Sequence, residues 1–282
     1  MALLLQVSHQ VVLQLETGMV GSQVDTHACE SATRADLGHA PGVGIWEQTG
    51  SDVRLDWGAE GVAALGRECA VLVVVDVLSF STTTDLVVAR GGRVLPVRWR
   101  DERGVAQARA AGAVIAGEGR FTLRPSSVTD IPPGTLLALP SPNGATLCDA
   151  AAATGAHVLA GCLRNASAVA AKAVSLGGPV GLIAAGERWG VNIFGHGETF
   201  GPLRPCVEDQ VGAGAIAAAL AGHGLSLSAE AALAARSADV TALASCVSGR
   251  ELSEAGHGGD VALAARLDVS DTAPVLTEGV LA

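Results

Sequence analysis

The residues best suited to chemistry follow a short apolar run in the first third of the chain. Residues 70–75 (AVLVVV) lead directly into Asp76, and a hydroxyl-rich turn with Ser79, Ser81 and Thr82 comes next. A continuous apolar run of this length is typical of a buried strand in a parallel sheet. Ligands of open α/β sheets bind beyond the carboxyl ends of the strands, near the N-termini of the following helices. We therefore expect Asp76 to lie in a functional site.

Polar residues stand in the same position after several later apolar runs, and two acids precede a helical segment. Hydroxyls, amides and main-chain N–H groups at helix starts suit phosphoryl or carboxylate oxygens. Carboxylates without a histidine pattern suit Mg²⁺, a hard cation that prefers oxygen ligands. The spacing is consistent with an anion and Mg²⁺ site, although ordinary helix caps and turns are an open alternative. The additional candidates are Glu118, Asn143, Gly144, Arg164, Asn165, Arg188, Glu208, Asp209 and Arg250.

Alternating strands and helices must position these residues. The hydrophobic patterns predict strands over 53–57, 70–76, 93–97, 113–117, 135–139, 157–160 and 180–185, with an edge strand over 273–276. They predict helices over 59–69, 83–90, 102–111 and 165–176. This alternation indicates an α/β fold with a mostly parallel or mixed sheet that is covered on both faces.

The pattern divides the chain into two parts. Residues 1–50 mix polar, glycine and single apolar residues without a sustained period, so we expect a poorly structured N-terminal extension. The regular order begins near residue 51 and continues to residue 282, which predicts one α/β domain. Within it, the glycine-rich segment 190–205 is longer than ordinary connections, which predicts a functional or mobile loop.

The net charge and composition limit the classes of binding partner and the location that we expect for this protein. The formal net charge of −10 argues against nucleic acid, which would require a basic stripe. The apolar runs are shorter than the roughly 18 residues of a membrane span, and the first residues lack a basic signal-peptide region. We therefore expect a cytoplasmic protein that acts on a small molecule, with a homo-oligomer left open. The six cysteines include no close pair, which favours reduced thiols.

One motif has the spelling of a dinucleotide fingerprint without its context. Residues 212–217 (GAGAIA) match the glycine spacing, but residues 207–211 (VEDQV) before them are no buried strand. We expect instead a helix that packs closely on a neighbour through its glycines.

Residues 73–82 (VVVDVLSFST) resemble the VIDVLRxST opening of the 2-phosphosulfolactate phosphatase (ComB-like) family. Further segments resemble the family in the same order, and together they cover roughly residues 52–280. No single segment is specific, but the ordered set is. The segments are 117–118 (GE), 142–144 (PNG), 163–170 (LRNASAVA), 184–186 (AAG), 208–216 (EDQVGAGAI), 248–252 (SGREL), 260–264 (DVALA) and 267–268 (LD).

The resemblance implies a three-layer α/β/α fold and an Mg²⁺-dependent phosphatase. Its substrate would be 2-phospho-3-sulfolactate, a precursor of coenzyme M, and its products 3-sulfolactate and phosphate. Two alternatives stay open. One is a phosphatase for another 2-hydroxy-acid phosphate, and the other is a non-catalytic homologue that only binds an anion.

Three departures from the family pattern bear on the substrate. Ser79 stands where the family has an arginine, which removes a cation expected to grip an anion. Residues 120–127 (RFTLRPSS) replace the family's GFDLGNSP, and the segment 190–205 lengthens a loop. Arg124, Arg188 or Arg204 are candidates to restore the missing charge.

These residues give a hypothetical mechanism with Asp76, Glu118 and Asn143 as the catalytic residues. Asp76 would hold Mg²⁺ with help from Glu118 or from the pair Glu208 and Asp209. The phosphoryl group would accept hydrogen bonds, and an arginine would bind the carboxylate and sulfonate. Leu78 stands where an Asp-x-Asp phosphatase carries its acid, so we favour attack by water, with Asp76 as nucleophile left open. The expected substrate-binding residues are Ser79, Ser81, Thr82, Gly144, Arg164, Asn165, Arg188 and Arg250.

Overall fold

The computed structural model describes residues 45–189 and 201–282. Most of the predicted N-terminal extension therefore lies outside the described residues. Its last part, 45–50, forms turns that are joined to the first strand, since the Gln48 side chain accepts a hydrogen bond from Leu55 N (3.1 Å) and donates one to Leu55 O (2.8 Å). The described domain thus begins before residue 51.

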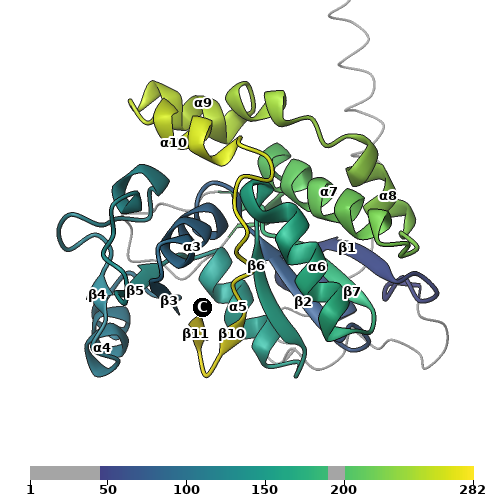
Figure 1. Cartoon of the computed structure of the whole chain (residues 1–282), viewed down its shortest axis with the longest axis horizontal. Helices are drawn as coiled ribbons and strands as arrows, with labels where there is room; N and C mark the ends of the chain where they lie inside the picture. The colour runs from purple at the N-terminus through teal and green to yellow at the C-terminus, as the bar shows by residue number, and fades with distance from the viewer. Residues whose placement is uncertain (1–44, 190–200) are drawn as a thin grey trace, which may run out of the picture. The chain divides into compact units, whose positions relative to one another are not determined.

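Four parallel strands form the first sheet (Figure 1). They are β1 (Val53–Trp57), β2 (Val71–Val75), β6 (His157–Gly161) and β7 (Val180–Ala184), in the spatial order β1-β7-β2-β6. Strand β2 is central and all five of its residues are buried, as expected for a continuous apolar run. The carboxyl end of β2 is therefore flanked by the carboxyl ends of β6 and β7.

Helices cover both faces of this sheet, because successive side chains of a strand point to opposite faces. Val71, Val73 and Val75 belong to a core with α6 (Ala166–Leu176) and α7 (Val207–Gly222). Leu72 and Val74 belong to a second core with α2 (Gly58–Leu65), α3 (Phe80–Ala89) and α5 (Gly144–Ala152). The result is the three-layer α/β/α arrangement that was predicted.

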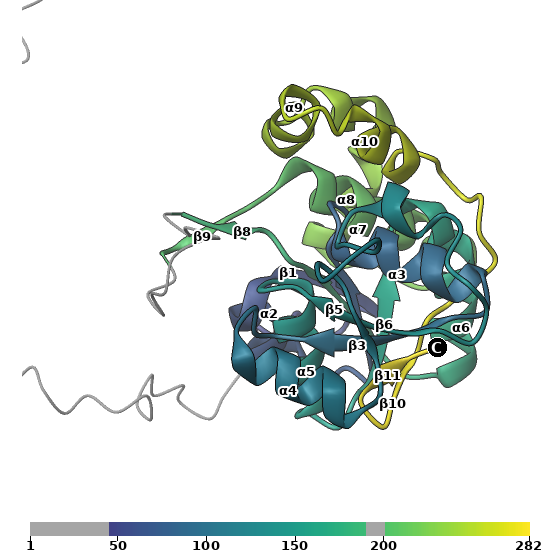
Figure 2. The same ribbon diagram turned by 90° about the vertical axis from the view of Figure 1, so that its left-hand side faces the viewer.

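The strands predicted over 93–97, 113–117 and 135–139 belong to a second, mixed sheet in the order β10-β11-β3-β5-β4. The predicted edge strand 273–276 shares only Leu276 with β10, and β11 was not predicted. Strands β3 (Arg93–Val97), β5 (Leu136–Pro140) and β4 (Val114–Ile115) are parallel, and the hairpin β10 (Leu276–Thr277) and β11 (Val280–Leu281) joins β3 in antiparallel sense. Helices α3 and α5 contact strands of both sheets. Helix α4 (Glu102–Ala110) contacts β3 and β4, and Figure 2 shows this second sheet with α4 in side view.

Shorter elements complete the domain. The strands β8 (Glu187–Arg188) and β9 (Leu203–Arg204) pair antiparallel on either side of residues 190–200, which lie outside the described residues. The C-terminal helices α8 (Ala229–Arg236), α9 (Val247–Glu254) and α10 (Gly258–Ala264) follow α7. Three 3₁₀ turns are η1 (Pro125–Val128), η2 (Leu163–Asn165) and η3 (Val240–Ala244). Over 45–189 and 201–282, no helix has the length and apolar character required to cross a membrane.

The glycines of residues 212–217 serve close helix packing, as expected. A Cβ at Gly212 would lie 2.6 Å from Cγ2 of Val77 and 3.0 Å from Cγ1 of Val75. A Cβ at Gly214 would overlap the main chain of α8 at Ala234. The glycines therefore let α7 approach β2 and α8, and this close approach brings the N-terminus of α7 to the end of β2.

Helix α3 begins three residues earlier than the predicted 83–90. The reason lies in the turn after β2, where Ser81 N donates to Asp76 O (2.8 Å) and Thr83 N donates to Ser79 O (2.9 Å). These bonds start the helix directly after the strand. Ser81 and Thr82 consequently lie in the first turn of α3 and not in an open loop.

Candidate functional site

Asp76 lies where the sequence predicted, just beyond the carboxyl end of β2, and is 7% exposed. Its Oδ1 accepts a hydrogen bond from Phe80 N at the start of α3 (3.3 Å). Its Oδ2 accepts one from Gly144 N at the start of α5 (2.9 Å). Two helix N-termini thus face this carboxylate, which their partial positive charge stabilises.

The loop between β5 and α5 joins Asp76 to a second acid. Ser141 Oγ lies 3.4 Å from Oδ2 of Asp76 and accepts from Gly144 N (3.1 Å). Asn143 Nδ2 donates to Oε1 of Glu187 (3.1 Å), which follows β7. The ends of β2, β5 and β7 are therefore connected through side chains, which places Asp76, Asn143, Gly144 and Glu187 in one cluster.

Asp209 holds two strand ends in place from the first turn of α7. Its Oδ1 accepts from Val77 N and its Oδ2 from Gly186 N, both at 2.8 Å. Its neighbour Glu208 is also buried, and Oε2 of Glu208 accepts a hydrogen bond from Cys246 Sγ (3.4 Å). Both acids form part of the region predicted for a metal, and Asp209 has a clear structural role in aligning the loops after β2 and β7.

These buried carboxylates destabilise each other's charged forms. Burial raises the pKa of Asp76 to about 6, and the charges of Glu187 and Glu208 act in the same direction. Burial, followed by the charges of Asp76 and Glu208, raises the pKa of Asp209 well above its usual range. A cluster of buried carboxylates is stabilised either when some of them are protonated or when a cation binds between them.

The hydroxyl groups of Ser81 and Thr82, which were predicted to bind phosphate, donate to main-chain carbonyls within the turn after β2. Ser81 Oγ donates to Val74 O (3.2 Å) and accepts from Asp76 N (3.0 Å), and Thr82 Oγ1 donates to Val77 O (2.8 Å). A hydroxyl has only one proton to donate. The structure therefore gives Ser81 and Thr82 a role in holding β2 to α3, in place of the free phosphate donors expected from the sequence. Ser79 remains half-buried at the N-cap of α3.

Three other candidates are not brought to this cluster by their hydrogen bonds. Arg164 is buried and its Nε donates to Oδ2 of Asp85 (2.7 Å). Asn165 Oδ1 accepts from Cys162 N (2.9 Å), which caps η2. Arg250 is exposed on α9, where it pairs with Glu254 (3.5 Å). The first two instead satisfy buried polar groups, and the third is a surface pair.

Arg188 lies beside the cluster on β8. Its main-chain N donates to Oε1 of Glu187 (2.9 Å), while its Nη2 pairs with Oε2 of Glu60 (3.2 Å). The Arg188 side chain is 22% exposed and that of Glu60 is 71% exposed. An exposed pair of this kind is weak, so the guanidinium can exchange Glu60 for another anion at little cost.

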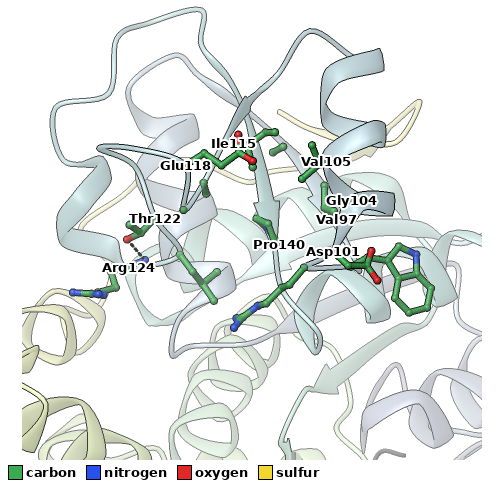
Figure 3. A pocket seen from close by; sticks show the side chains of 15 residues that line it. Val97, Asp101, Gly104, Val105, Ile115, Glu118, Thr122, Arg124 and Pro140 are labelled. Carbon is green, nitrogen blue, oxygen red and sulfur yellow. Dashed lines mark hydrogen bonds between the residues drawn. The ribbon is translucent and has the colours of Figure 1, made fainter. Parts of the chain in front are cut away.

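Glu118 lies in a separate pocket of about 380 Å³ at the carboxyl ends of the second sheet (Figure 3). Val97, Ala138 and Pro140 contribute from β3 and β5, and Ile115 contributes from β4. Glu118 itself is exposed. Within the described residues, no hydrogen bond joins its side chain to Asp76, so the joint role that the sequence predicted for these two carboxylates stays a prediction.

Arg100 is a functional candidate that was not among the residues predicted from the sequence. It lines this pocket, and its guanidinium interacts electrostatically with Glu187 and Asp76. Partial burial lowers the pKa of Arg100, and those two carboxylates oppose the change. The sequence signal for Arg100 is its position three residues after β3, beyond the carboxyl end of a parallel strand.

Gly144 is the tightest point of the cluster and supplies a test of its geometry. A Cβ at this position would overlap the ring of Phe80 and lie 2.8 Å from Oδ2 of Asp76. We expect Gly144→Ala to lower the free energy of unfolding by about 1–3 kcal/mol, because overpacking forces side chains or main chain to shift. Activity should fall more than stability alone explains, since Gly144 N would move from Asp76. Thermal unfolding and kcat/KM measure the two effects.

Gly222→Ala is the matched control, because a Cβ at Gly222 on α7 meets nothing within 4 Å. This variant should be neutral or slightly stabilising. If Gly144→Ala abolishes folding, the double variant with Phe80→Leu should restore part of the loss by making room. A Gly144→Ala protein with unchanged stability and activity would contradict the close packing described above.

Comparison with known proteins adds independent support. A sequence model of the 2-phosphosulpholactate phosphatase family matches residues 62–279, which include β2, β5, β7 and the start of α7. No curated protein gives a significant match to the chain. The matched range contains Asp76, Asn143, Gly144, Glu187 and Asp209. The chain belongs to the 2-phosphosulpholactate phosphatase family and is a phosphoric monoester hydrolase.

Proposed function

We propose that the protein is an Mg²⁺-dependent phosphatase that converts 2-phospho-3-sulfolactate into 3-sulfolactate and phosphate. The observation that carries this proposal is the convergence of Asp76, Asn143, Gly144 and Glu187 at the ends of three strands, within the range matched by the family. In the reaction, a water oxygen bonds to phosphorus while the ester P–O bond breaks. The leaving oxygen takes a proton and becomes the hydroxyl of sulfolactate.

The donor set fits Mg²⁺. The available ligands are carboxylate oxygens, and the mutual repulsion of Asp76, Glu187 and Glu208 is the arrangement that a divalent cation relieves. No cluster of three acidic, histidine or cysteine side chains is preformed for a metal within 45–189 and 201–282. Mg²⁺ typically takes one or two carboxylates and completes its shell with waters and substrate phosphate. Asp76, with Glu187 or Glu208, would hold the ion, which would neutralise charge on the phosphoryl oxygens.

The chain's own residues have distinct tasks in this proposal. Asp209 keeps the loops after β2 and β7 at a fixed separation through its two main-chain hydrogen bonds. Asn143, which is held by Glu187, would donate its other amide proton to a phosphoryl oxygen. Arg100, whose guanidinium interacts electrostatically with Asp76 and Glu187, and Arg188, which follows Glu187 on β8, would attract the anionic substrate.

Removal of divalent cations tests the metal requirement. We expect EDTA to abolish phosphate release from 2-phospho-3-sulfolactate and added Mg²⁺ to restore it. Independently of turnover, Mg²⁺ at about 100 times its Kd should stabilise the folded protein by about 2.7 kcal/mol, a shift measurable by thermal unfolding. The shift should be absent in Asp76→Asn.

The same experiment separates the alternatives. Phosphate release that is insensitive to EDTA would contradict the metal requirement. Binding of sulfolactate by folded protein without any release in Mg²⁺ would instead identify a non-catalytic anion-binding homologue. Release from other 2-hydroxy-acid phosphates but not from 2-phospho-3-sulfolactate would identify a phosphatase with a different substrate.

A further inference from the structure

A second cavity, of about 480 Å³, lies along the outer edge of the first sheet and shares no lining residue with the acidic cluster. The edge strand β1 contributes three consecutive residues, Leu55–Trp57. Because successive side chains of a strand point to opposite faces, a cavity that meets all three lies along the open edge of the strand. The other walls are the turns of residues 45–50, Gln210 of α7, and α8, which contacts β1 (Figure 1). Its volume is typical of small-molecule sites.

The turns before β1 form a fixed wall of this edge cavity. The side-chain amide of Gln48 makes hydrogen bonds to both main-chain groups of Leu55. The buried Arg54 donates from Nη1 to Glu47 O (2.7 Å) and from Nε to Ser51 O (3.0 Å). These bonds attach the turns to β1 on both sides of the cavity wall. The edge cavity is therefore preformed, as ligand sites usually are.

The polar lining of the edge cavity is negatively charged. Asp56 of β1 and the exposed Glu230 of α8 line it, and its described lining residues include no lysine, arginine or histidine. Oδ1 of Asp56 accepts a hydrogen bond from Trp57 N (2.7 Å), and within the described residues neither carboxylate is paired with a cation. Burial raises the pKa of Asp56, and the charges of Glu230 and Glu60 act in the same direction. The cavity therefore favours a cation, whereas the phosphate ester proposed as substrate has the opposite charge.

Two indole rings and an aliphatic side chain form much of the remaining wall. Trp46 is 65% exposed, Leu233 is exposed, and Trp57 is half-buried. Within the described residues, arginines lie over the rings of Trp99 and Trp189, but no cation lies over Trp46 or Trp57. The face of an indole attracts a cation, and its apolar surface packs against alkyl groups. A metal ion gains nothing from such walls, because hard cations prefer oxygen ligands. The lining therefore favours an organic cation.

We propose that the edge cavity is a second ligand site, which binds an organic ammonium cation with apolar substituents. Trp46 and Trp57 pack against the substituents, while Asp56 and Glu230 neutralise the charge. Aromatic side chains recognise quaternary ammonium groups in this way. The site uses none of the residues assigned to phosphate release, so it does not depend on the proposed phosphatase function.

Two quaternary ammonium probes, choline and benzyltrimethylammonium, test the proposal by isothermal titration calorimetry on the full chain. We expect both to bind saturably at one site, and more weakly as salt screens the carboxylates. The alcohol 3,3-dimethylbutanol has the shape of choline without its charge. It should bind at least about tenfold more weakly, because it has no attraction to the indoles' faces or to the carboxylates. Absence of saturable binding by both ammonium probes, or equal affinities for choline and the alcohol, would overturn the cation site.

Variants in the wall locate the binding. Trp46→Ala should raise the Kd of both ammonium probes about 5- to 10-fold, since a cation–aromatic contact is lost. Glu230→Gln should raise it about threefold, because this carboxylate is exposed. The matched controls are Trp189→Ala, which removes a tryptophan that is 60% exposed, and Glu251→Gln, which neutralises an exposed acid on α9. Neither residue lines the edge cavity, so both controls should keep the wild-type Kd.

Two further outcomes decide where the probes bind. Circular dichroism shows which variants are folded, and Glu230→Gln decides alone if Trp46→Ala does not fold. An unchanged Kd in the folded wall variants would refute the assignment. Asp76→Asn should keep the wild-type Kd for choline, because Asp76 does not line the edge cavity. Loss of choline binding in a folded Asp76→Asn protein would assign the cation to the acidic cluster and overturn the second site.

Discussion

Replacement of Asp76 by asparagine should lower kcat/KM by at least about 10²- to 10³-fold. The carboxylate is the only acid of the described residues that faces the N-termini of both α3 and α5, through Phe80 N and Gly144 N. An amide keeps one acceptor oxygen but turns an NH₂ group toward one of these donors. It also removes the charge that would hold Mg²⁺, and loss of one electrostatic element in a preorganised site has an effect of this size. Steady-state phosphate release measures it.

Asp149→Asn is the control for this experiment, because Asp149 is an exposed acid on α5 whose nearest cation, Arg98, is 3.9 Å away. It should retain wild-type activity. Circular dichroism and thermal unfolding must show that Asp76→Asn is folded. A folded Asp76→Asn protein with wild-type kcat/KM would remove Asp76 from the active site.

From the raised pKa of Asp76 we also expect wild-type activity to depend on pH. Burial, with the charges of Glu187 and Glu208, raises this pKa to about 6. Above pH 6 the carboxyl is mainly ionised, and below it is mainly protonated. If the ionised form is the active one, activity without saturating Mg²⁺ declines as the pH falls through 6.

The fold was largely predictable because it depends on short-range patterns. The run that forms β2 is apolar at every position, which matches a strand buried on both faces. The alternation with helices then requires a sheet covered on both sides. The division of the strands into two sheets was not predictable, because strand order depends on which helices lie between them. Helices α3 and α5 contact both sheets, and no local pattern records this.

The sequence predicted those site residues whose proximity follows from their position at the end of a strand. Asp76 and Gly144 follow strands whose ends meet, so their proximity follows from the fold. Side-chain direction was not predictable for Ser81, Thr82 and Asn165, because main-chain groups nearby compete for their hydrogen bonds. Arg100 was missed for a related reason. Its position after β3 was a signal, but its relation to Asp76 depends on how α3 and α5 hold the two sheets together, which spacing in the sequence does not record.

Arg164 illustrates the same limit, and its replacement should have the largest effect on stability. Its side chain is 8% exposed and pairs with the fully buried Asp85, which also accepts a hydrogen bond from Thr272 Oγ1 (2.6 Å). Its Nη1 donates to Leu263 O (3.2 Å). Arg164→Met would leave the charge of Asp85 buried without its partner. We expect the free energy of unfolding to fall by about 3–5 kcal/mol in denaturant titrations.

The double variant Arg164→Met/Asp85→Leu removes both charges and should recover most of this loss, because apolar side chains of similar volume can replace a buried ion pair. The single variant, assayed below its unfolding transition, should keep a KM within about twofold of wild type if Arg164 serves only the fold. A substrate-binding role for Arg164, as predicted from the sequence, requires the opposite pattern. Unchanged stability with a KM raised tenfold or more would show that the guanidinium leaves Asp85 to bind substrate, since loss of a charged hydrogen bond to a ligand has this magnitude.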